Sequence, residues 1–348
     1  MTDVYLIRHG EAEGNDFRRM HGHYDSLLMP RGIAQAERVA ARLTDTPIHG
    51  VFSSDLTRAL LTAIPLCREK GLPLHREQAF REIQMGPWED RPYGQLLAFE
   101  PETMHAFHHD PVAWRLEGAE TYVEYTDRFL TRLEEICREY DGGSVAVFCH
   151  GAVMRGVLIR LFFGDSFQQI PIADNTGVSH LRYQNGSYSY EYVNDSSHVP
   201  VEISTFAYQS WWRTKKTKPD MYFLPGREVE PLPRELAGLP EGQIHLVGIW
   251  NGKPSAAVSL GEPEGDTGFL LGMRVLRELE GRNYSDQLLG CAFSHFRSRG
   301  CRKLRAVGDA YPENILSNFG FSGSVPERSI DTKGTLKAAM EQSGVMFA

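Results

Sequence analysis

Short runs of apolar residues alternate with amphipathic stretches along the first half of the chain. The runs at 4–7, 51–53 and 144–149 are short and apolar and predict buried parallel strands. Between and after them, apolar residues recur at helical spacing. The expected helices cover residues 33–43, 56–67, 122–140 and 152–163. This alternation predicts an α/β domain with a mostly parallel sheet, whose ligands gather at the carboxyl ends of the strands.

The pattern changes near residue 200. The segment 185–195 predicts a last hairpin-like strand, and prolines and glycines become frequent after it. Further along, two strands joined at Asn251-Gly252, another strand and a helix capped by Ser285 are expected. The chain is therefore predicted to form two α/β units, at residues 1–198 and 203–348.

Composition and charge narrow the classes of function. The formal net charge of -8 disfavours a nucleic-acid binder, so an anionic substrate would have to be held by a local cluster of cations. The first residues lack the features of a signal peptide, and no apolar run is long enough to cross a membrane, so we expect a cytoplasmic location without membrane association. The cysteines are odd in number and lack metal-ligand spacing, which disfavours a disulfide framework. They are Cys67, Cys137, Cys149, Cys291 and Cys301.

Two histidines directly follow predicted strands, and arginines accompany them. His9 follows Arg8, His150 precedes Gly151, and Arg58 lies near the start of another helix. A neutral imidazole can attack phosphorus, while guanidinium groups and helix N-terminal amides can hold phosphate oxygens. The pattern predicts phosphoryl transfer with His9 as the nucleophile and the two arginines as a phosphate clamp. A protonated His150 would be a further donor.

These segments resemble the signatures of the histidine phosphatase superfamily, also called phosphoglycerate-mutase-like, over residues 1–198. The matching segments are Arg8-His9-Gly10-Glu11 with Asn15, Asp25-Ser26-Leu27-Leu28 with Gly32 and Gln35-Ala36, 53–59 with Thr62-Ala63, Arg81-Glu82-Ile83 with 86–89, and Cys149-His150-Gly151. The resemblance implies a three-layer α/β fold, a phosphohistidine intermediate on His9, and Glu82 as general acid and later base. It implies no metal or other cofactor. The residues that it implies for binding the phosphoryl group are Arg8, Asn15, Arg58, His150 and Gly151.

Some of these roles have competitors. Glu77 and Glu89 lie close enough in sequence to compete for the acid role, and Asn15 could merely cap a turn. The segment 90–114 lacks the paired arginines and prolines with which the mutase branch holds a second phosphate, which favours a phosphatase. Gly118-Ala119-Glu120 stands where many relatives have Gly-Glu-Ser, so Glu120 replaces the serine, and a contact made there by a serine hydroxyl is not expected.

Two clusters suggest other functions. The first has ligand-like helical spacing but lies in the irregular segment over the expected site, so a polar lid is preferred to a metal site. It consists of His105, His108, His109 and Asp110. The second, residues 211–218, combines tryptophans with arginine and lysines and could stack on nucleic-acid bases. In an acidic chain we favour a packing element between the two units.

The second unit resembles the GNAT-type N-acetyltransferase fold over residues 203–324. In that family a loop at a helix N-terminus binds the pyrophosphate of acetyl-CoA, and the matching loop here contains Arg282, Asn283 and Ser285. Asn283 replaces a glycine, and Leu316 replaces a tyrosine that often acts as the acid. We therefore expect acetyl-CoA binding to be weak or absent.

The main hypothesis is a phosphatase for a small phosphorylated metabolite, fused to a divergent or inactive GNAT-like unit. Specificity is expected to lie in the irregular segment 81–118, with the second unit as a further location that the sequence leaves open. The alternatives are a bifunctional phosphatase and N-acetyltransferase, a phosphoglycerate mutase, and a phosphate-binding regulatory protein that has lost catalysis.

Overall fold

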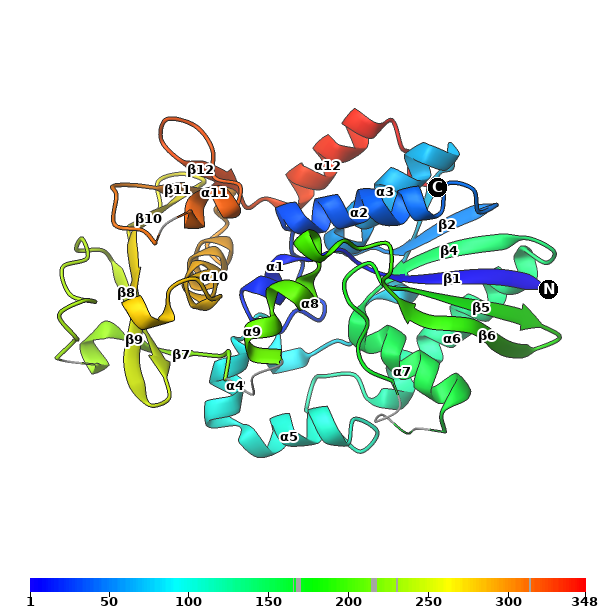
Figure 1. Cartoon of the computed structure of the whole chain (residues 1–348), viewed down its shortest axis with the longest axis horizontal. Helices are drawn as coiled ribbons and strands as arrows, with labels where there is room; N and C mark the ends of the chain where they lie inside the picture. Colours follow the sequence, from blue (N-terminus) through cyan, green and yellow to red (C-terminus); the bar gives the residue numbers. More distant parts are fainter. Residues whose placement is uncertain (165, 167–169, 214–217, 230, 313) are drawn as a thin grey trace.

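The described part of the chain forms two six-stranded sheets (Figure 1). The computed structural model describes all residues except 165, 167–169, 214–217, 230 and 313. The first sheet has the order β3-β2-β4-β1-β5-β6, in which the first four strands are parallel and β5 and β6 are antiparallel to their neighbours. The predicted α/β fold is confirmed, with a mixed sheet. Its strands are β1 (Thr2–Arg8), β2 (Gly50–Ser54), β3 (Leu74–Glu77), β4 (Ser144–Cys149), β5 (Val178–Gln184) and β6 (Ser187–Asp195).

Helices cover both faces of the first sheet, which gives three layers (Figure 1). α2 (Pro30–Arg42) and α3 (Thr57–Lys70) pack on one face, and α6 (Tyr122–Glu139) and α7 (Gly151–Phe162) pack on the other. β2 and β4 are buried along their whole length, which agrees with the short apolar runs in their sequences. Among the helices described, none combines the length and apolar character that crossing a bilayer requires.

The segment between β3 and α6, expected to be irregular, contains two short helices. α4 (Tyr93–Phe99) and α5 (Pro101–His109) pack on the first core through the fully buried Leu96 and Met104. Pro101 suits the first position of α5, where a backbone N–H would have no partner within the helix. Both helices are too short for hydrophobic periodicity to identify them from the sequence.

The second sheet has the order β12-β11-β10-β9-β8-β7, in which β10 and β11 run parallel and the other neighbours run antiparallel. The hairpin predicted at Asn251-Gly252 joins β8 to β9, and both residues have positive φ, 50° and 75°. α10 (Tyr284–Arg297) packs on β9 and β10. It begins two residues earlier than expected, with Asn283 at the N-cap instead of Ser285. The strands are β7 (Tyr222–Pro225), β8 (Ile244–Trp250), β9 (Lys253–Leu260), β10 (Thr267–Val275), β11 (Lys303–Ala306) and β12 (Glu327–Ser329).

The end of the chain returns to the first sheet. α12 (Thr332–Ser343) packs against α3, and Val345 belongs to the core beneath them. The Leu74 N–H donates to the Met346 carbonyl at 2.9 Å, and the Ala348 N–H donates to the Leu74 carbonyl at 3.1 Å. These bonds cover the open edge of β3. The last residues of the predicted second unit therefore pack with the first unit.

The two units share a packed interface around α1 (Glu13–Asp16), which follows His9. Phe17 is part of the core of the second sheet. Gly290 allows α10 to approach, because a Cβ there would lie 2.6 Å from the Phe17 Cβ. Glu13 is fully buried and accepts hydrogen bonds from Arg297 at 2.5 and 2.9 Å. The second unit thus helps to hold the loop that follows His9.

Candidate active site

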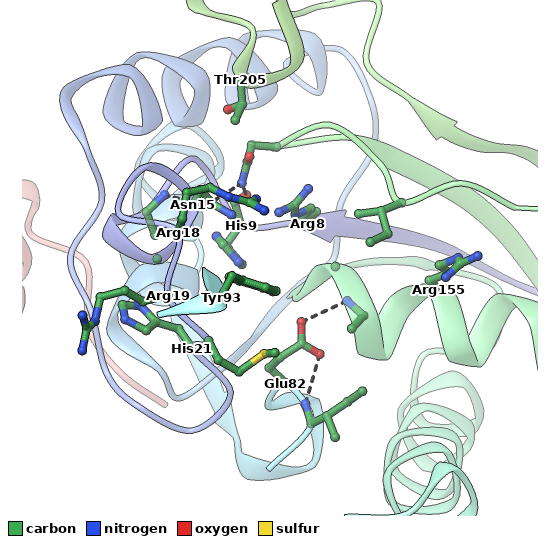
Figure 2. Close-up of a pocket in the computed structure, with 18 of the residues that line it drawn as sticks. Arg8, His9, Asn15, Arg18, Arg19, His21, Glu82, Tyr93, Arg155 and Thr205 are labelled. Atoms are coloured by element: carbon green, nitrogen blue, oxygen red, sulfur yellow. Dashed lines mark hydrogen bonds between the residues drawn. The ribbon is translucent and has the colours of Figure 1, made fainter. Parts of the chain in front are cut away.

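The carboxyl ends of β1, β2 and β4 bring the predicted catalytic residues to one edge of the first sheet. His9 follows β1, His150 follows β4, and Arg58 lies in the first turn of α3 after β2. Because these strands are parallel neighbours, the three side chains come close together. His9 and Arg58 line one cavity of about 450 Å³, and His150 lies next to His9 outside the described lining. Figure 2 shows Arg8 and His9 on one wall of this cavity and Glu82 across from them.

His9 is held as a neutral imidazole. Its Nδ1 lies 2.7 Å from the carbonyl oxygen of Gly10, and since a carbonyl oxygen can only accept, Nδ1 carries the proton. Nε2 therefore has the lone pair that attack on phosphorus requires. Burial, then the charges of Arg58 and Arg8, hold the pKa of His9 well below its usual 6.5. At neutral pH this histidine is in its nucleophilic form.

His150 is fully buried behind the described cavity wall, with its ring centre 5.1 Å from that of His9. Its Nδ1 accepts a hydrogen bond of 3.2 Å from the Arg58 Nε, so Nε2 carries the proton and donates to the Ser54 Oγ over 2.8 Å. Burial and the Arg58 charge hold the pKa of His150 well below 6.5. The protonated His150 expected from the sequence is therefore not the form that this structure supports.

Arg8 and Arg58 place two buried positive charges at the cavity. Arg58 Nη1 and Nη2 donate to the carbonyl oxygens of Tyr24 and Gly22 at 2.9 and 2.7 Å. The Arg8 Nε is buried without a hydrogen-bond partner among the described residues. A Cβ at Gly151 would lie 3.0 Å from this nitrogen, so the glycine leaves room for the guanidinium. A buried N–H without a partner is costly, and an anion in the cavity would satisfy it.

Glu82 is bound at the N-terminus of α7. Its Oε2 accepts the Ala152 N–H at 2.9 Å, and its Oε1 accepts the N–H groups of Val153 and Ile83 at 2.7 and 3.0 Å. These backbone contacts fix the orientation of the Glu82 carboxyl group at the cavity. Of the described residues that line the cavity, Glu82 alone is acidic.

The two neighbouring glutamates serve other contacts. Glu77 forms an ion pair of 2.7 Å with Arg132, outside the cavity lining. The carboxylate of Glu89 organises the loop after α1 by accepting backbone N–H groups. These belong to Gly22, His23, Tyr24 and Met85. The geometry therefore favours Glu82 over both for an acid–base role.

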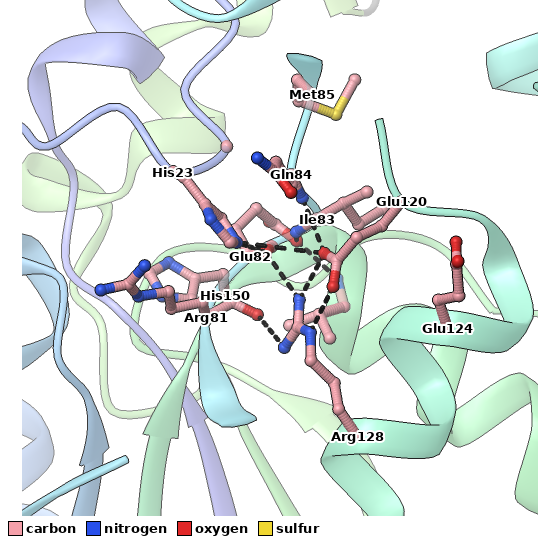
Figure 3. A network of polar contacts seen from close by, with 12 residues as sticks. His23, Arg81, Glu82, Ile83, Gln84, Met85, Glu120, Glu124, Arg128 and His150 are labelled. Atoms are coloured by element: carbon pink, nitrogen blue, oxygen red, sulfur yellow. Dashed lines mark hydrogen bonds and ion pairs between the residues drawn. The ribbon is translucent and has the colours of Figure 1, made fainter. Parts of the chain in front are cut away.

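An ion pair between Arg128 and Glu120 supports the backbone of Glu82 (Figure 3). Arg128 donates to the carbonyl oxygens of Ala79, Arg81 and Glu82 at 2.8 to 2.9 Å. It also binds both carboxylate oxygens of Glu120 at 2.6 and 2.7 Å. Glu120, at the position flagged in the sequence, thus supports the Glu82 segment through Arg128 and does not line the cavity.

Two asparagines lie next to His9. The Asn15 Oδ1 accepts the Ala12 N–H at 2.9 Å, so Asn15 caps the turn, and its side chain also lines the cavity. Asn175 was not predicted. Its Nδ2 donates to the His9 carbonyl at 2.9 Å, while its Oδ1 is buried without a partner in the described structure. The short polar stretch 174–176 before β5 was the available sequence signal.

The cavity also extends beyond the predicted residues. From the first unit, it is lined by further cationic and aromatic side chains. These include Arg18, Arg19, His21, Tyr93, Phe107, Tyr125 and Arg155. The linker between the two sheets also contributes to the cavity wall, through α8 (Thr205–Tyr208) and α9 (Ser210–Arg213). The linker residues in the lining are Thr205, Phe206, Gln209 and Arg213. None of these four linker residues is among the site residues predicted from the sequence.

The histidine cluster divides between the cavity and the surface. His108 and the adjacent Phe107 line the cavity, in agreement with the expected lid. His105 and His109 instead contact each other with tilted rings, whose centres are 4.3 Å apart. Within the described residues, no group of three histidine, cysteine or acidic side chains is arranged to hold a metal ion.

The aromatic and basic segment 211–218 is described only in part. Trp211 packs on Tyr284 with ring centres 5.4 Å apart and borders the core of the second sheet. The Arg282 guanidinium lies 5.4 Å from the centre of the Trp211 ring. These contacts agree with a packing element between the units. The Trp212 side chain and residues 214–217, with two of the lysines, lie outside the described residues.

The loop compared with an acetyl-CoA site is closed by its own side chains. Asn283 is 1% exposed, and neither polar atom of its side chain has a partner among the described residues. The Tyr284 hydroxyl donates to the Lys218 carbonyl at 3.0 Å. Leu316, at the position of the family's tyrosine, packs against the core of the second sheet.

Residues 4–196 match the model of the histidine phosphatase superfamily (branch 1), which is more than half of the chain. The chain belongs to this superfamily. The relative named "Probable phosphoglycerate mutase GpmB" from Escherichia coli O1:K1 is 32% identical over 164 residues, which cover 47% of this chain and 76% of the relative. Branch members include phosphatases and mutases, so the superfamily assignment supports phosphoryl-group chemistry in residues 4–196.

Solved structures agree with this assignment. YhfR from Bacillus stearothermophilus has a TM-score of 0.55 and 26% identity, and the match covers 57% of this chain and 100% of YhfR. A mycobacterial glucosyl-3-phosphoglycerate phosphatase has a TM-score of 0.53 and 24% identity over 56% of this chain and 99% of its own, which shows a shared fold. The family match ends just after β6, so α8, α9 and the second sheet lie beyond it.

Proposed function

We propose that this chain is a phosphatase that hydrolyses a small phosphate monoester through a phosphohistidine intermediate on His9. One observation carries the proposal. A neutral His9, with its lone pair on Nε2, lies between the buried guanidinium groups of Arg8 and Arg58 and across the cavity from Glu82. The proposal includes no metal and no other cofactor.

The first chemical step transfers the phosphoryl group to the histidine. The His9 Nε2 attacks phosphorus, the bond to the ester oxygen breaks, and Glu82 gives a proton to the leaving oxygen. Arg8 and Arg58 bind the phosphoryl oxygens, with Asn15 and the N–H of Gly151 as further donors. The hydrogen bond from Nδ1 to the Gly10 carbonyl stabilises the positive charge that develops on the ring.

The second step releases the phosphate. Glu82, now a carboxylate, takes a proton from a water molecule that attacks phosphorus, and the P–N bond breaks. This returns neutral His9 and inorganic phosphate. In both steps His150 keeps the Arg58 guanidinium oriented through its hydrogen bond to Nε, and the amides of α7 orient Glu82.

A phosphoglycerate mutase is the alternative within the family, and the name of the relative from E. coli favours it. The mutase branch holds a second phosphate with arginines and prolines inserted after the acid segment. Residues 90–114 lack that insertion and instead fold into α4 and α5 beside the cavity. Hydrolysis is therefore the preferred outcome. The third alternative, a regulatory protein without catalysis, is disfavoured by the neutral nucleophile.

We further propose that the second unit is a divergent GNAT-like module without acetyl-CoA binding. The buried Asn283 and the packed Leu316 support this proposal and disfavour a bifunctional enzyme. A small phosphorylated metabolite is the expected partner, without nucleic acid or membrane. The cysteines are free and buried in the structure, which supports a reducing, cytoplasmic location.

The test is release of inorganic phosphate by the full-length protein from 4-nitrophenyl phosphate and from a panel of phosphorylated metabolites. We expect hydrolysis of the aryl phosphate and of a subset of metabolites, without interconversion of 2- and 3-phosphoglycerate. Interconversion would support the mutase, and binding of phosphate without any turnover would support the regulatory alternative.

A further inference from the structure

The cavity wall carries a second pair of arginines that the proposed mechanism does not use. Arg18 follows α1 and Arg213 ends α9, and both line the cavity that contains His9. Figure 2 shows Arg18 on the side of the cavity that also bears His9, opposite Glu82. We call Arg18 and Arg213 the distal arginine pair. Arg213 lies beyond the residues that match the superfamily, so this part of the wall belongs to the linker of this chain.

An aromatic ring positions each member of the distal arginine pair. The guanidinium carbon of Arg213 is 3.5 Å from the ring centre of Phe206, and that of Arg18 is 4.8 Å from the ring centre of Tyr93. Both rings line the same cavity. A stacked guanidinium presents its N–H donors edgewise in its own plane, which is the geometry that binds carboxylate and phosphate oxygens.

The charges around the pair favour an anion. Arg18 binds Asp220 through Nε and Nη2 at 2.7 and 3.2 Å, which fixes its orientation. Partial desolvation, then the positive charges of Arg8 and Arg18, lower the pKa of Arg213, while Asp174 acts in the opposite direction. Among the described residues that line the cavity, arginines outnumber Glu82, the one acidic residue. An anionic ligand group fits this excess of positive charge.

The second unit anchors the segment that carries Arg213. The Tyr208 hydroxyl at the end of α8 donates to the Asp286 Oδ2 on α10 at 3.1 Å. The Gln209 Nε2 donates to the Asn15 carbonyl at 3.3 Å, and Trp211 packs on the second core. A segment that only connected the two units would not need side-chain contacts with both of them. The α8–α9 segment is thus held in place over the cavity.

We propose that the distal arginine pair binds a second anionic group of the substrate, a carboxylate or a phosphate. The substrate is then a phosphate monoester whose alcohol part is itself anionic. A cavity of about 450 Å³ accommodates a metabolite with both groups. This inference rests on the proposed function for the position of the scissile phosphate at His9.

Binding of phosphonates that cannot be hydrolysed tests the pair separately from catalysis. The full-length protein is titrated calorimetrically with phenylphosphonate and with 4-carboxyphenylphosphonate. We expect the carboxylated ligand to bind about 10-fold more tightly or better, because charge-assisted hydrogen bonds from arginine are strong. Arg213→Ala should remove most of this difference and leave phenylphosphonate binding within about 3-fold. Arg213 is exposed, so this variant should fold.

Two further variants sharpen the test. Arg213→Lys should restore part of the preference, and Arg138→Ala, which removes an exposed arginine of α6 paired with Glu134, should leave it unchanged. Three results would contradict the proposal that the distal arginine pair binds a second anionic group. They are equal binding of the two ligands by the unsubstituted protein, no binding of either ligand, and an equal loss of affinity for both ligands in Arg213→Ala. If the protein prefers the carboxylated phosphonate but hydrolyses no phosphate ester, the proposed phosphatase function is wrong, and the proposed role of the distal arginine pair is still supported.

Discussion

The N-termini of α7 and α10 differ in whether a ligand can reach them. At α7, Gly151 leaves space for the Arg8 guanidinium, and the Ala152 and Val153 amides face Glu82 at the cavity. At α10, the preceding Asn283 is buried, and its side chain fills the loop that a phosphate would need. Both helices carry the partial positive charge of an N-terminus. The residue at the start of the helix determines whether a ligand can reach that charge.

This contrast assigns different tasks to the two units. The first unit supplies the nucleophile, the phosphate clamp and the acid. The second supplies Gly290 and Arg297, which hold the α1 loop. It also anchors the α8–α9 segment over the cavity. Substitutions at the α7 end should therefore affect chemistry strongly, whereas those at the α10 end should affect it little.

The largest effect is expected for His9→Ala. Because the substitution removes the atom that attacks phosphorus, kcat for an aryl phosphate should fall by about 1,000-fold or more. His245→Ala in β8 is the matched control and should retain activity. Phosphate release under saturating substrate measures both. Activity of His9→Ala within about 10-fold of the parent would show that another group is the nucleophile.

Glu82→Gln should discriminate between leaving groups. An alkyl phosphate needs a proton at the leaving oxygen, so its kcat should fall by about 100-fold, against less than about 10-fold for 4-nitrophenyl phosphate. The comparison uses both substrates on the same preparation, with Glu77→Gln as the control. Equal slowing of the two substrates would indicate that Glu82 only supports the backbone of its segment.

The sequence predicted the chemistry at strand ends better than the contacts between distant segments. His9 and Arg58 could be located because each sits in a motif directly after a strand, and parallel strands meet at one edge. Asn175 lies in a short polar stretch and Arg213 in an aromatic and basic segment, but neither pattern points to the cavity, since only folding brings these residues there. The return of α12 to the first sheet likewise depends on an open strand edge that no short pattern encodes.

Gly151→Ala tests the space at the α7 end. The new Cβ would lie 3.0 Å from the Arg8 Nε and 3.4 Å from Ile172 Cγ2, so the guanidinium must shift. We expect KM for an aryl phosphate to rise by about 10-fold, with little change in melting temperature. Steady-state kinetics and thermal unfolding provide the two readouts. An unchanged KM would mean that Arg8 does not need this position to bind phosphate.

Stability should depend on pH through the two buried imidazoles. The pKa values of His9 and His150 in the folded state lie well below the usual 6.5. As the pH falls through this value the unfolded chain takes up protons first, so the free energy of unfolding decreases below about pH 6.5. Urea unfolding at about pH 7.5 and about pH 5.5 measures the change, which should shrink in His150→Gln. A larger decrease in the free energy of unfolding of His150→Gln would contradict a lowered pKa for His150.

The smallest effect is expected at the α10 end. Calorimetric titration of the full-length protein with acetyl-CoA should show a Kd weaker than about 1 mM, because Asn283 fills the loop. Arg282→Ala should leave phosphatase activity unchanged. A Kd in the low micromolar range that Arg282→Ala abolishes would show that this helix end is open to a ligand after all.

The most direct test of the central claim is to trap the intermediate. The protein is mixed with a phosphate ester labelled in the phosphoryl group and quenched in alkali within one turnover, since phosphohistidine survives alkali and hydrolyses in acid. Peptide mapping should then find the label on the peptide with His9, and His9→Ala should carry none. Label on His150 or another residue, or rapid turnover without any labelled peptide, would contradict the account.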